Sequence, residues 1–452
     1  MKQWTAQRVA AAAGARLIGP PASRGGPERV EIDSREAGPG VLFVGLAGAR
    51  RDGGAYASEA LAAGAWGTLT SPDHAARLAR GGTGAVLAAA DPLRALQRLA
   101  TAWRRHLDVQ VIGVTGSTGK TSTKDLLKAL LAPHRRTFAS RANFNTEIGL
   151  PLEILAAPAD TQVLVLEMGM RGAGQIAELA EIAEPDVAVI VSIGPVHLEL
   201  MGTVEAVAAA KAELIGALAP GATAVIPAGE RLLEPWLRDD ITTVTFGEGG
   251  AVRFVHQAPE HVVIDAAGER IELEVPFPQA HLRSNLLAAV AAARAVGVTA
   301  SGRVALRLSA GRGESVSLAG GVTVIDGCYN ANPMSMRAAL ADLADSAERV
   351  AAVRRVAVLG DMLELGPGAR DYHAELGQLA NAAGVDLLVT VGPLAAAIAE
   401  RFAGPATAFA DAEAAAAAVP ELLEPGDLVL VKGSLGVGLK RVCDSLGVGA
   451  PA

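Results

Sequence analysis

Aromatic residues and cysteines are scarce in this sequence. Phe, Trp and Tyr make up 3% of the 452 residues, and only two cysteines occur, Cys328 and Cys443. The two cysteines lie far apart in the sequence and match no metal-ligand spacing, a pattern that fits a reducing compartment. Alanine and glycine are abundant instead, which predicts Ala-rich helices that pack closely together.

The chain also lacks an excess of positive charge and long hydrophobic runs. Its net charge is −8 and its 40 Lys and Arg form no basic block, which argues against nucleic acid or an anionic membrane as the main partner. No run of about 18 uninterrupted apolar residues exists, so we expect no membrane insertion. Residues 1–17 have a basic start but no Leu-rich core, which predicts an amphipathic helix rather than a signal peptide. We therefore expect a cytoplasmic protein.

The most informative stretch is residues 109–131. An apolar, β-branched run predicts a buried strand, and the periodic leucines from Leu126 to Leu131 predict a helix. Between them lies the loop TGSTGKT, in which glycines free backbone N–H groups to turn inward, Lys120 would reach the β- and γ-phosphates and Thr121 would bind Mg²⁺. The strict phosphate-loop form has glycine where this chain has Val114, so the match is to a variant. A plain glycine-rich turn is the alternative, but the Lys-Thr pair and both flanks favour a nucleoside triphosphate site.

Two further buried strands end on polar residues. The run 163–166 ends on Glu167, and the run 187–194 is followed by His197. Continuous apolar strands that alternate with helices predict a parallel, doubly wound sheet, in which ligands lie beyond the carboxyl ends of the strands. Glu167 is then either a second Mg²⁺ anchor or a helix cap, and His197 is either functional or an ordinary packed histidine.

Lys211 interrupts the apolar stripe of a predicted helix at 203–218. Such a lysine usually extends to solvent or pairs with a carboxylate. A desolvated lysine, however, has a depressed pKa and an available neutral amine, which suits chemistry or modification. The sequence leaves these alternatives open.

The predicted fold class is α/β in three domains. Residues 1–94 form a small α/β N-terminal domain, residues 95–310 form the central doubly wound, mostly parallel sheet with the phosphate loop, and residues 311–452 form a Rossmann-like domain without a GxGxxG loop. Period-two alternation in 222–280 predicts a smaller antiparallel patch. The loop containing Ser34 and Arg35 holds either a phosphate or polar headgroup or only solvated charges.

Taken together, the motifs resemble the Mur ligase family. They occur in order along essentially the whole chain. They are DSRxxxPG (33–40), TGSTGKTS (115–122), NFNTEIGLP (143–151), EMGMRGxGQI (167–176), IGPVHLE (193–199), HxxxN (281–285), GR (311–312), DxxYNANPxSM (326–336), GDMLELG (360–366) and KGS (432–434).

The resemblance implies an ATP-dependent amide ligase of cytoplasmic peptidoglycan-precursor synthesis, hence of cell wall biogenesis, cell shape and cell division. ATP would phosphorylate the terminal carboxylate of a UDP-N-acetylmuramoyl-tripeptide. The amine of D-alanyl-D-alanine would then attack the acyl phosphate and release phosphate alongside ADP. The combination of YNANPxSM, GDMxELG and KGS points to the family branch that adds this dipeptide. A monomer is expected.

The resemblance also implies roles for individual residues. Lys120, His197 and Lys211 would be catalytic. Two Mg²⁺ ions would be held, one by Thr121 and Glu167, the other by His197 and a carbamylated Lys211. The nucleotide would contact Gly116, Ser117, Thr118, Gly119, Lys120, Thr121, Asn285, Arg312 and Asp326. The UDP-muramoyl peptide and the dipeptide would contact Ser34, Arg35, Asn145, Thr146, Arg171, Asn330 and Asn332.

The sequence departs from the family pattern at three positions. The pattern has histidine at Gly54, a second acid at Gly327 and arginine at Leu435, whose part Lys440 or Arg441 would take. Two rival hypotheses remain: a sibling ligase or folylpolyglutamate synthase within the same class, and a nucleotide-dependent binding protein without catalysis. The intact Lys120, Glu167, His197 and Lys211 favour an active enzyme.

Overall fold

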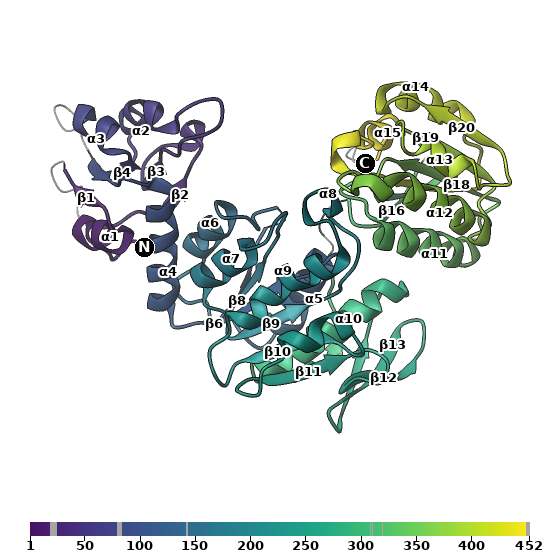
Figure 1. The fold of residues 1–452 in the computed structure, drawn as a ribbon, viewed down its shortest axis with the longest axis horizontal. Helices are drawn as coiled ribbons and strands as arrows, with labels where there is room; N and C mark the ends of the chain where they lie inside the picture. Colours follow the sequence, from purple (N-terminus) through teal and green to yellow (C-terminus); the bar gives the residue numbers. More distant parts are fainter. Residues whose placement is uncertain are drawn as a thin grey trace.

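The computed structural model describes residues 1–18, 25–78, 84–141, 143–307, 309, 311–318 and 320–448. Three α/β lobes follow one another along the chain, and the N-terminal and C-terminal lobes lie apart on the central one (Figure 1). The predicted three-part α/β fold is confirmed. The predicted boundary at residue 310 lies outside the described residues, and the division at 94–95 falls in the first turn of a continuous helix, α4 (Pro92–Leu107). None of the described helices is long and apolar enough to cross a membrane.

The N-terminal lobe is a five-stranded sheet with the order β1-β5-β4-β3-β2, parallel except for β1. Its strands are β1 (Arg16–Leu17), β2 (Arg29–Glu31), β3 (Val41–Val44), β4 (Gly67–Thr70) and β5 (Ala85–Ala88). Its helices are α1 (Ala6–Ala13), α2 (Ala57–Ala62) and α3 (Pro72–Leu78), with the short 3₁₀ turns η1 (Ser34–Glu36) and η2 (Gly53–Tyr56). The amphipathic first helix is thus α1, which packs against α4.

The central lobe is built on a ten-stranded sheet with the order β15-β14-β13-β12-β11-β10-β9-β6-β8-β7. Its strands are β6 (Gln110–Thr115), β7 (Thr137–Ala139), β8 (Val163–Glu167), β9 (Val187–Ile190), β10 (Thr223–Pro227), β11 (Thr242–Phe246), β12 (Val252–Gln257), β13 (His261–Ala266), β14 (Glu269–Glu274) and β15 (Gly302–Arg303). The strands from β7 to β11 are parallel. Every residue of β8 and β9 is buried, because helices cover both faces of the sheet.

The antiparallel patch predicted within 222–280 is confirmed for β12, β13 and β14, but not for β11. β11 pairs parallel with β10, and the antiparallel strands β12, β13 and β14 continue the same sheet. Period-two alternation reports that one face of a strand is wet, and it carries no information about which sheet the strand joins. The helix α10 (Ala280–Ala295) covers the dry face of these strands with closely packed alanines.

Two helical layers enclose the central sheet. The helix α5 (Lys120–Leu131) packs with α10 on one face, and α6 (Gly149–Ala156), α7 (Gln175–Ala183) and α9 (Val204–Gly216) pack on the other. The short helix α8 (Leu198–Met201) and the 3₁₀ turn η3 (Arg231–Trp236) complete the lobe.

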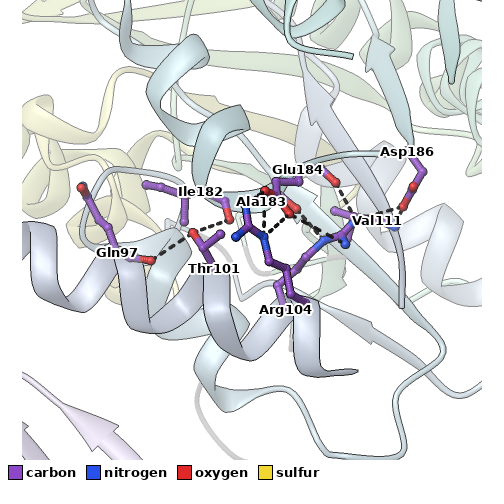
Figure 2. A network of polar contacts seen from close by, with 9 residues as sticks. Gln97, Thr101, Arg104, Val111, Ile182, Ala183, Glu184 and Asp186 are labelled. Carbon is purple, nitrogen blue, oxygen red and sulfur yellow. Dashed lines mark hydrogen bonds and ion pairs between the residues drawn. The ribbon is translucent and has the colours of Figure 1, made fainter. Parts of the chain in front are cut away.

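The helix α4 fixes the N-terminal lobe to the central one. Pro92 and the N-cap Asp91, which accepts from Arg94 N, begin this helix. Figure 2 shows its side chains reaching the end of α7: Thr101 Oγ1 donates to Ile182 O (3.0 Å), and Arg104 donates to the carbonyls of Ala183 (3.0 Å) and Glu184 (2.7 Å). The guanidinium thereby caps carbonyls that a helix end leaves unpaired.

The C-terminal lobe is a six-stranded sheet with the order β16-β17-β21-β18-β19-β20, parallel except for β16. Its strands are β16 (Glu314–Ser317), β17 (Thr323–Gly327), β18 (Arg354–Gly360), β19 (Leu387–Val391), β20 (Ala406–Phe409) and β21 (Asp427–Lys432). Helices α11 (Pro333–Arg349), α12 (Ala369–Ala382) and α13 (Ala396–Ala399) cover one face, and α14 (Ala412–Leu422) and α15 (Lys440–Ser445) cover the other. The short 3₁₀ turns η4 (Gly366–Gly368) and η5 (Leu435–Val437) follow β18 and β21.

Candidate active site

The phosphate loop joins β6 to α5 and requires glycine at two positions. Gly116 (φ 155°) and Gly119 (φ 81°) have backbone angles that L-residues rarely adopt. A Cβ on Gly119 would also lie 2.7 Å from Asn285 Oδ1 and 2.8 Å from Val191 Cγ1. Neighbouring side chains therefore pack closely against the backbone of the loop. The N-terminus of α5 points its free N–H groups into the loop.

The segment that follows strand β9 braces this loop. Ser192 accepts from Ser117 N (2.9 Å) through its carbonyl and from Thr118 N (2.9 Å) through its hydroxyl. The Ser117 hydroxyl donates to Gly194 O (3.0 Å). The Ser117 side chain therefore supports the loop from behind, a role that the loop motif alone did not indicate.

Thr121 and Glu167 meet at the mouth of the loop. Thr121 Oγ1 donates to Glu167 Oε2 (2.8 Å), and Asn145 Nδ2 donates to Glu167 Oε1 (2.8 Å). Arg312 Nη2, which comes from the C-terminal part of the chain, donates to Thr121 Oγ1 (3.0 Å). The hydroxyl and carboxylate oxygens are the hard ligands that Mg²⁺ prefers, and the Arg312 guanidinium already bonds the hydroxyl, so this pair fits a cation.

His197 is held by a residue that the sequence analysis did not single out. Glu364, in the loop after β18, hydrogen-bonds His197 Nδ1, and its other carboxylate oxygen lies 3.7 Å from Arg171 Nε. Its carbonyl also accepts from Glu199 N (3.1 Å). Burial lowers the pKa of His197, although the Glu364 carboxylate opposes the shift. A histidine whose Nδ1 is engaged in this way presents Nε2 to a ligand.

Lys211 is buried on α9 and lines the same cleft. The residue is 2% exposed, so its amine does not extend to bulk solvent, and within the described ranges it forms no ion pair with a carboxylate. Burial first and the nearby Lys120 second lower its pKa well below the usual value. Of the alternatives left open by the sequence, the available neutral amine agrees best with this environment.

A cleft of about 870 Å³ lies between the central and C-terminal lobes. The predicted site residues that line it are Gly116, Ser117, Thr118, Gly119, Lys120, Thr121, Asn145, Thr146, Glu167, Arg171, His197, Lys211, Arg312, Asn330 and Asn332. Asn285 lies behind the loop against Gly119, and Asp326 is buried beside the cleft. Ser34 and Arg35 belong to η1 of the N-terminal lobe and do not line the cleft; Arg35 is paired there with Asp33.

The cleft gathers buried positive charge. Desolvation lowers the pKa values of Lys120 and Arg312, and that of Lys432 falls to about 8, with Arg312 lowering both lysine values further. Lys120 Nζ meanwhile donates to Gly116 O (2.8 Å). Buried like charges are unfavourable unless an anion joins them, so the cleft suits polyphosphate and carboxylate ligands.

The C-terminal lobe touches the phosphate loop through the segment that follows β17. Asn332 caps α11 by accepting from Ser335 N (2.9 Å), and its Nδ2 donates to Ser117 O (3.3 Å). Tyr329 stacks on the Arg312 guanidinium at 3.9 Å from ring centroid to Cζ. Glu364, Tyr329 and Lys432 are among the cleft residues whose part the sequence analysis did not assign, although the motifs that contain them were noted.

The structure explains one of the three positions at which this sequence departs from the family pattern. At Gly54 a Cβ would lie 2.5 Å from His74 Cδ2, and His74 Nε2 hydrogen-bonds Asp52 Oδ2 (2.8 Å). An imidazole from α3 thus occupies the space above Gly54. Leu435 is 64% exposed at the cleft edge, and nothing in the structure explains the replacement there. Gly327 lies against β21, where a Cβ would be 3.3 Å from Val431 O.

Sequence profiles assign most of the chain to known domains. The Mur ligase middle domain matches residues 114–293, and the Mur ligase glutamate ligase domain matches residues 311–435. The chain therefore belongs to the Mur ligase family, an assignment that confirms the resemblance of its motifs.

Particular relatives narrow the comparison. The UDP-N-acetylmuramoyl-tripeptide–D-alanyl-D-alanine ligase of Synechocystis is 36% identical over 92% of this chain and 90% of its own, and the Bacillus subtilis enzyme of that name is 34% identical over 92% of each. Crystal structures of MurF are similar to the structure of this chain over nearly its whole length. That from Acinetobacter baumannii has a TM-score of 0.84 (28% identity, 98% of both chains), and that from Thermotoga maritima, a complex with ADP, has 0.78 (29% identity, 92% of this chain, 96% of its own).

Proposed function

We propose that this chain joins D-alanyl-D-alanine to UDP-N-acetylmuramoyl-tripeptide at the expense of ATP, through an acyl phosphate, in the cytoplasmic synthesis of peptidoglycan precursors. The observation that carries the proposal is the single cleft in which the phosphate loop, the Thr121–Glu167 pair and the buried cations converge. The names of the relatives, which are similar over nearly the whole chain, support the same substrates. We expect a monomer.

The chemistry begins with a carboxylate, which is a poor acyl donor. Transfer of the γ-phosphoryl group of ATP to that carboxylate brings two anions together, so the reaction needs positive charge around the transferring group. Lys120 and Arg312 supply it from the loop and from the opposite lobe. The dipeptide amine then attacks the acyl carbon, the C–N bond forms, and inorganic phosphate leaves with the former carboxylate oxygen.

Thr121 and Glu167 would hold Mg²⁺, since their oxygen atoms already face one another at 2.8 Å. When bound, the ion would neutralise charge on the phosphates that bridge to it. Asn145 keeps the Glu167 carboxylate oriented by donating to its second oxygen. Asn285, Asp326 and the loop residues would contact the rest of the nucleotide.

Lys211 would act as a carbamate in this scheme. Its neutral amine would add to CO₂, forming an N–C bond and releasing one proton, and the product would be an anionic oxygen ligand. Together with His197 Nε2, that ligand would hold a second Mg²⁺. The low pKa of the buried amine supports this assignment, because only the unprotonated form reacts.

The N-terminal lobe, residues 1–94 in the predicted division, would bind the UDP end of the substrate through Ser34 and Arg35. Asn145, Thr146 and Arg171 would then position the peptide end in the cleft, and Asn330 and Asn332 would face the incoming dipeptide. Because these residues belong to separate lobes, we expect lobe closure to assemble the site and to shelter the acyl phosphate from water.

The test is an acceptor comparison. Purified protein with ATP, Mg²⁺ and UDP-N-acetylmuramoyl-tripeptide should release ADP when D-alanyl-D-alanine is added, and mass spectrometry should find the pentapeptide product. D-alanine alone and a panel of single amino acids serve as matched acceptors. ADP release with a single amino acid but not with the dipeptide would assign the chain to a sibling activity, and release with no acceptor would indicate a binding protein.

A further inference from the structure

Two thiols that are distant in the sequence meet in the C-terminal lobe. Cys328 follows β17 and Cys443 lies on α15, and their Sγ atoms are 3.2 Å apart. Cys328 is 5% exposed and Cys443 is fully buried, within the apolar layer that α14 and α15 form on the sheet. The sequence separation of 115 residues gave no sign of this contact.

We propose that Cys328 and Cys443 form a reversible disulfide, so that the pair is an oxidation site separate from the chemistry of the cleft. The sulfurs need to approach by about 1.2 Å to reach the S–S bond length of about 2.0 Å. Since the chain has only these two cysteines, each thiol has one possible partner within the molecule.

We expect α15 to make this movement, because the segment that carries Cys328 is anchored. Lys432 Nζ donates to Asn330 O (2.8 Å) and Gly327 O (3.4 Å), which fixes the segment on both sides of Cys328. The helix α15 has six residues. A helix of this length has few hydrogen bonds of its own, so it shifts toward β17 more readily than the strand-bound segment at Cys328.

A metal site is the alternative reading of the same cluster. Asp326 lies with the two thiols so that all three ligand atoms are within 4.8 Å of one another. Two thiolates on one tetrahedral Zn²⁺ stand about 3.7 Å apart, given Zn–S bonds of about 2.3 Å, so the Sγ–Sγ distance of 3.2 Å does not separate the two alternatives. The Lys440 ammonium, however, lies 3.9 Å from Asp326 Oδ2 and opposes a second cation there, which favours the disulfide.

The oxidant in this reaction would be a low-molecular-weight disulfide such as oxidised glutathione. One protein thiolate attacks a glutathione sulfur, and the first glutathione leaves as a thiolate. The second protein thiolate attacks the mixed disulfide, the Cys328–Cys443 bond forms and the second glutathione leaves, taking up the protons. The hydrogen bond between the thiols and their burial raise the pKa of Cys328, so the reaction should proceed while α15 is open.

The Cys328–Cys443 disulfide should also affect the cleft, and this expected effect rests on the proposed contact of Asp326 with the nucleotide. Lys440 precedes Cys443 by one helical turn and already faces Asp326. If α15 moves toward β17, the ammonium comes closer to this carboxylate and competes with the nucleotide for it. We expect the KM for ATP to rise by about threefold in the oxidised enzyme, the size of one partly exposed ion pair.

The experiment uses the full chain with excess oxidised glutathione. Intact mass spectrometry should show the loss of two hydrogen atoms, reversed by dithiothreitol, and peptide mapping should find the two cysteine peptides joined. The matched variants Cys328→Ser and Cys443→Ser should lose no hydrogen pair and should carry at most one glutathione. Peptide mapping uses the unaltered chain, so its result stays valid if a cysteine variant fails to fold.

Three outcomes would overturn the proposal. One is a folded chain that keeps both thiols while the urea-unfolded chain forms the bond. Another is a product that is only a disulfide-linked dimer. The third is stoichiometric zinc that blocks oxidation in the unaltered chain and does not bind to Cys443→Ser.

Thermal unfolding adds a readout that does not use activity. Closing a loop of 115 residues should raise the Tm of the oxidised lobe by about 10 to 15 °C, and no rise would contradict a formed bond. An unchanged KM for ATP in a chain with a mapped disulfide would remove the proposed effect on the cleft. Loss of all turnover in the reduced chain would instead count against the proposed function.

Discussion

The two faces of the cleft are built by the same rule and differ in how they are held. Each is the carboxyl edge of a parallel sheet, β6, β8 and β9 on the central face and β17, β18 and β21 on the C-terminal face. On the central face the loop, Thr121 and Glu167 are bonded to one another within a single sheet. The C-terminal face reaches them through individual polar contacts between lobes.

Three of those contacts are hydrogen bonds to residues of the predicted site. Arg312 donates to Thr121, Asn332 donates to Ser117 O, and Glu364 bonds His197. The comparison teaches that the hydrogen bonds holding the loop, Thr121 and Glu167 together lie within the central lobe, whereas the C-terminal face adds single contacts to them. Substitutions on the central face should therefore abolish the chemistry, and those on the C-terminal face should weaken it.

The largest effect is expected at Lys120. Lys120→Ala removes the loop's ammonium from the transferring phosphoryl group and should lower kcat/KM by at least about 10³-fold. Lys128→Ala, on an exposed position of the same helix, is the control and should change activity little. Steady-state ADP release measures both, and Lys120→Ala activity within a few-fold of the unaltered enzyme would refute the role of this lysine.

The second test concerns the space around the loop. Gly119→Ala places a Cβ against Asn285 and Val191 and should cost at least about tenfold in activity and about 2 kcal/mol in stability. Gly174→Ala is a matched control, because Gly174 has the same φ of 81° with no neighbour within 4 Å of a Cβ. Equal losses of stability in the two variants would show that backbone strain, and not the close approach, sets the cost.

The third test moves to the contact between faces. Glu364→Gln should lower kcat by about 10- to 100-fold, because an amide no longer stabilises the His197 orientation that the carboxylate sets. Glu199→Gln, whose exposed side chain lies on the adjacent α8, is the control. Nitrogen-15 NMR of the His197 ring should also show a changed tautomer population in Glu364→Gln, and an unchanged population would remove the positioning role.

The smallest expected effect is a pH dependence from the C-terminal face. The pKa of Lys432 is lowered to about 8 by burial and by Arg312, so its ammonium is present below that pH and is lost as the pH rises through it. The KM for the anionic substrate should therefore increase above about pH 8, by a few-fold, and Lys432→Arg should flatten that limb. A profile that is the same in both enzymes would exclude Lys432 from substrate binding.

The central face was predictable from the sequence because its information is local. A strand, a glycine loop and a helix are contiguous, and Glu167 and the His197 loop follow apolar runs that pair with β6 on either side in the parallel sheet. The same locality explains why alternation within 222–280 predicted the antiparallel strands β12 to β14 but not the parallel pairing of β11.

The rest depended on contacts that no local pattern encodes. The pairing of Glu364 with His197 joins residues that are 167 positions apart, and the contact of Cys328 with Cys443 spans 115. Likewise, the gap at Gly54 is filled by His74 from another helix. Tertiary packing decides such contacts, and the resemblance to the family supplied site residues only where a motif matched. The individual roles assigned by that resemblance stay predictions.

The most direct measurement follows the oxygen of the activated carboxylate. UDP-N-acetylmuramoyl-tripeptide labelled with ¹⁸O in its terminal carboxylate should give inorganic phosphate that carries one ¹⁸O atom after ligation, because the acyl phosphate breaks at its C–O bond. Unlabelled phosphate, or label found in AMP, would contradict activation by γ-phosphoryl transfer in this cleft.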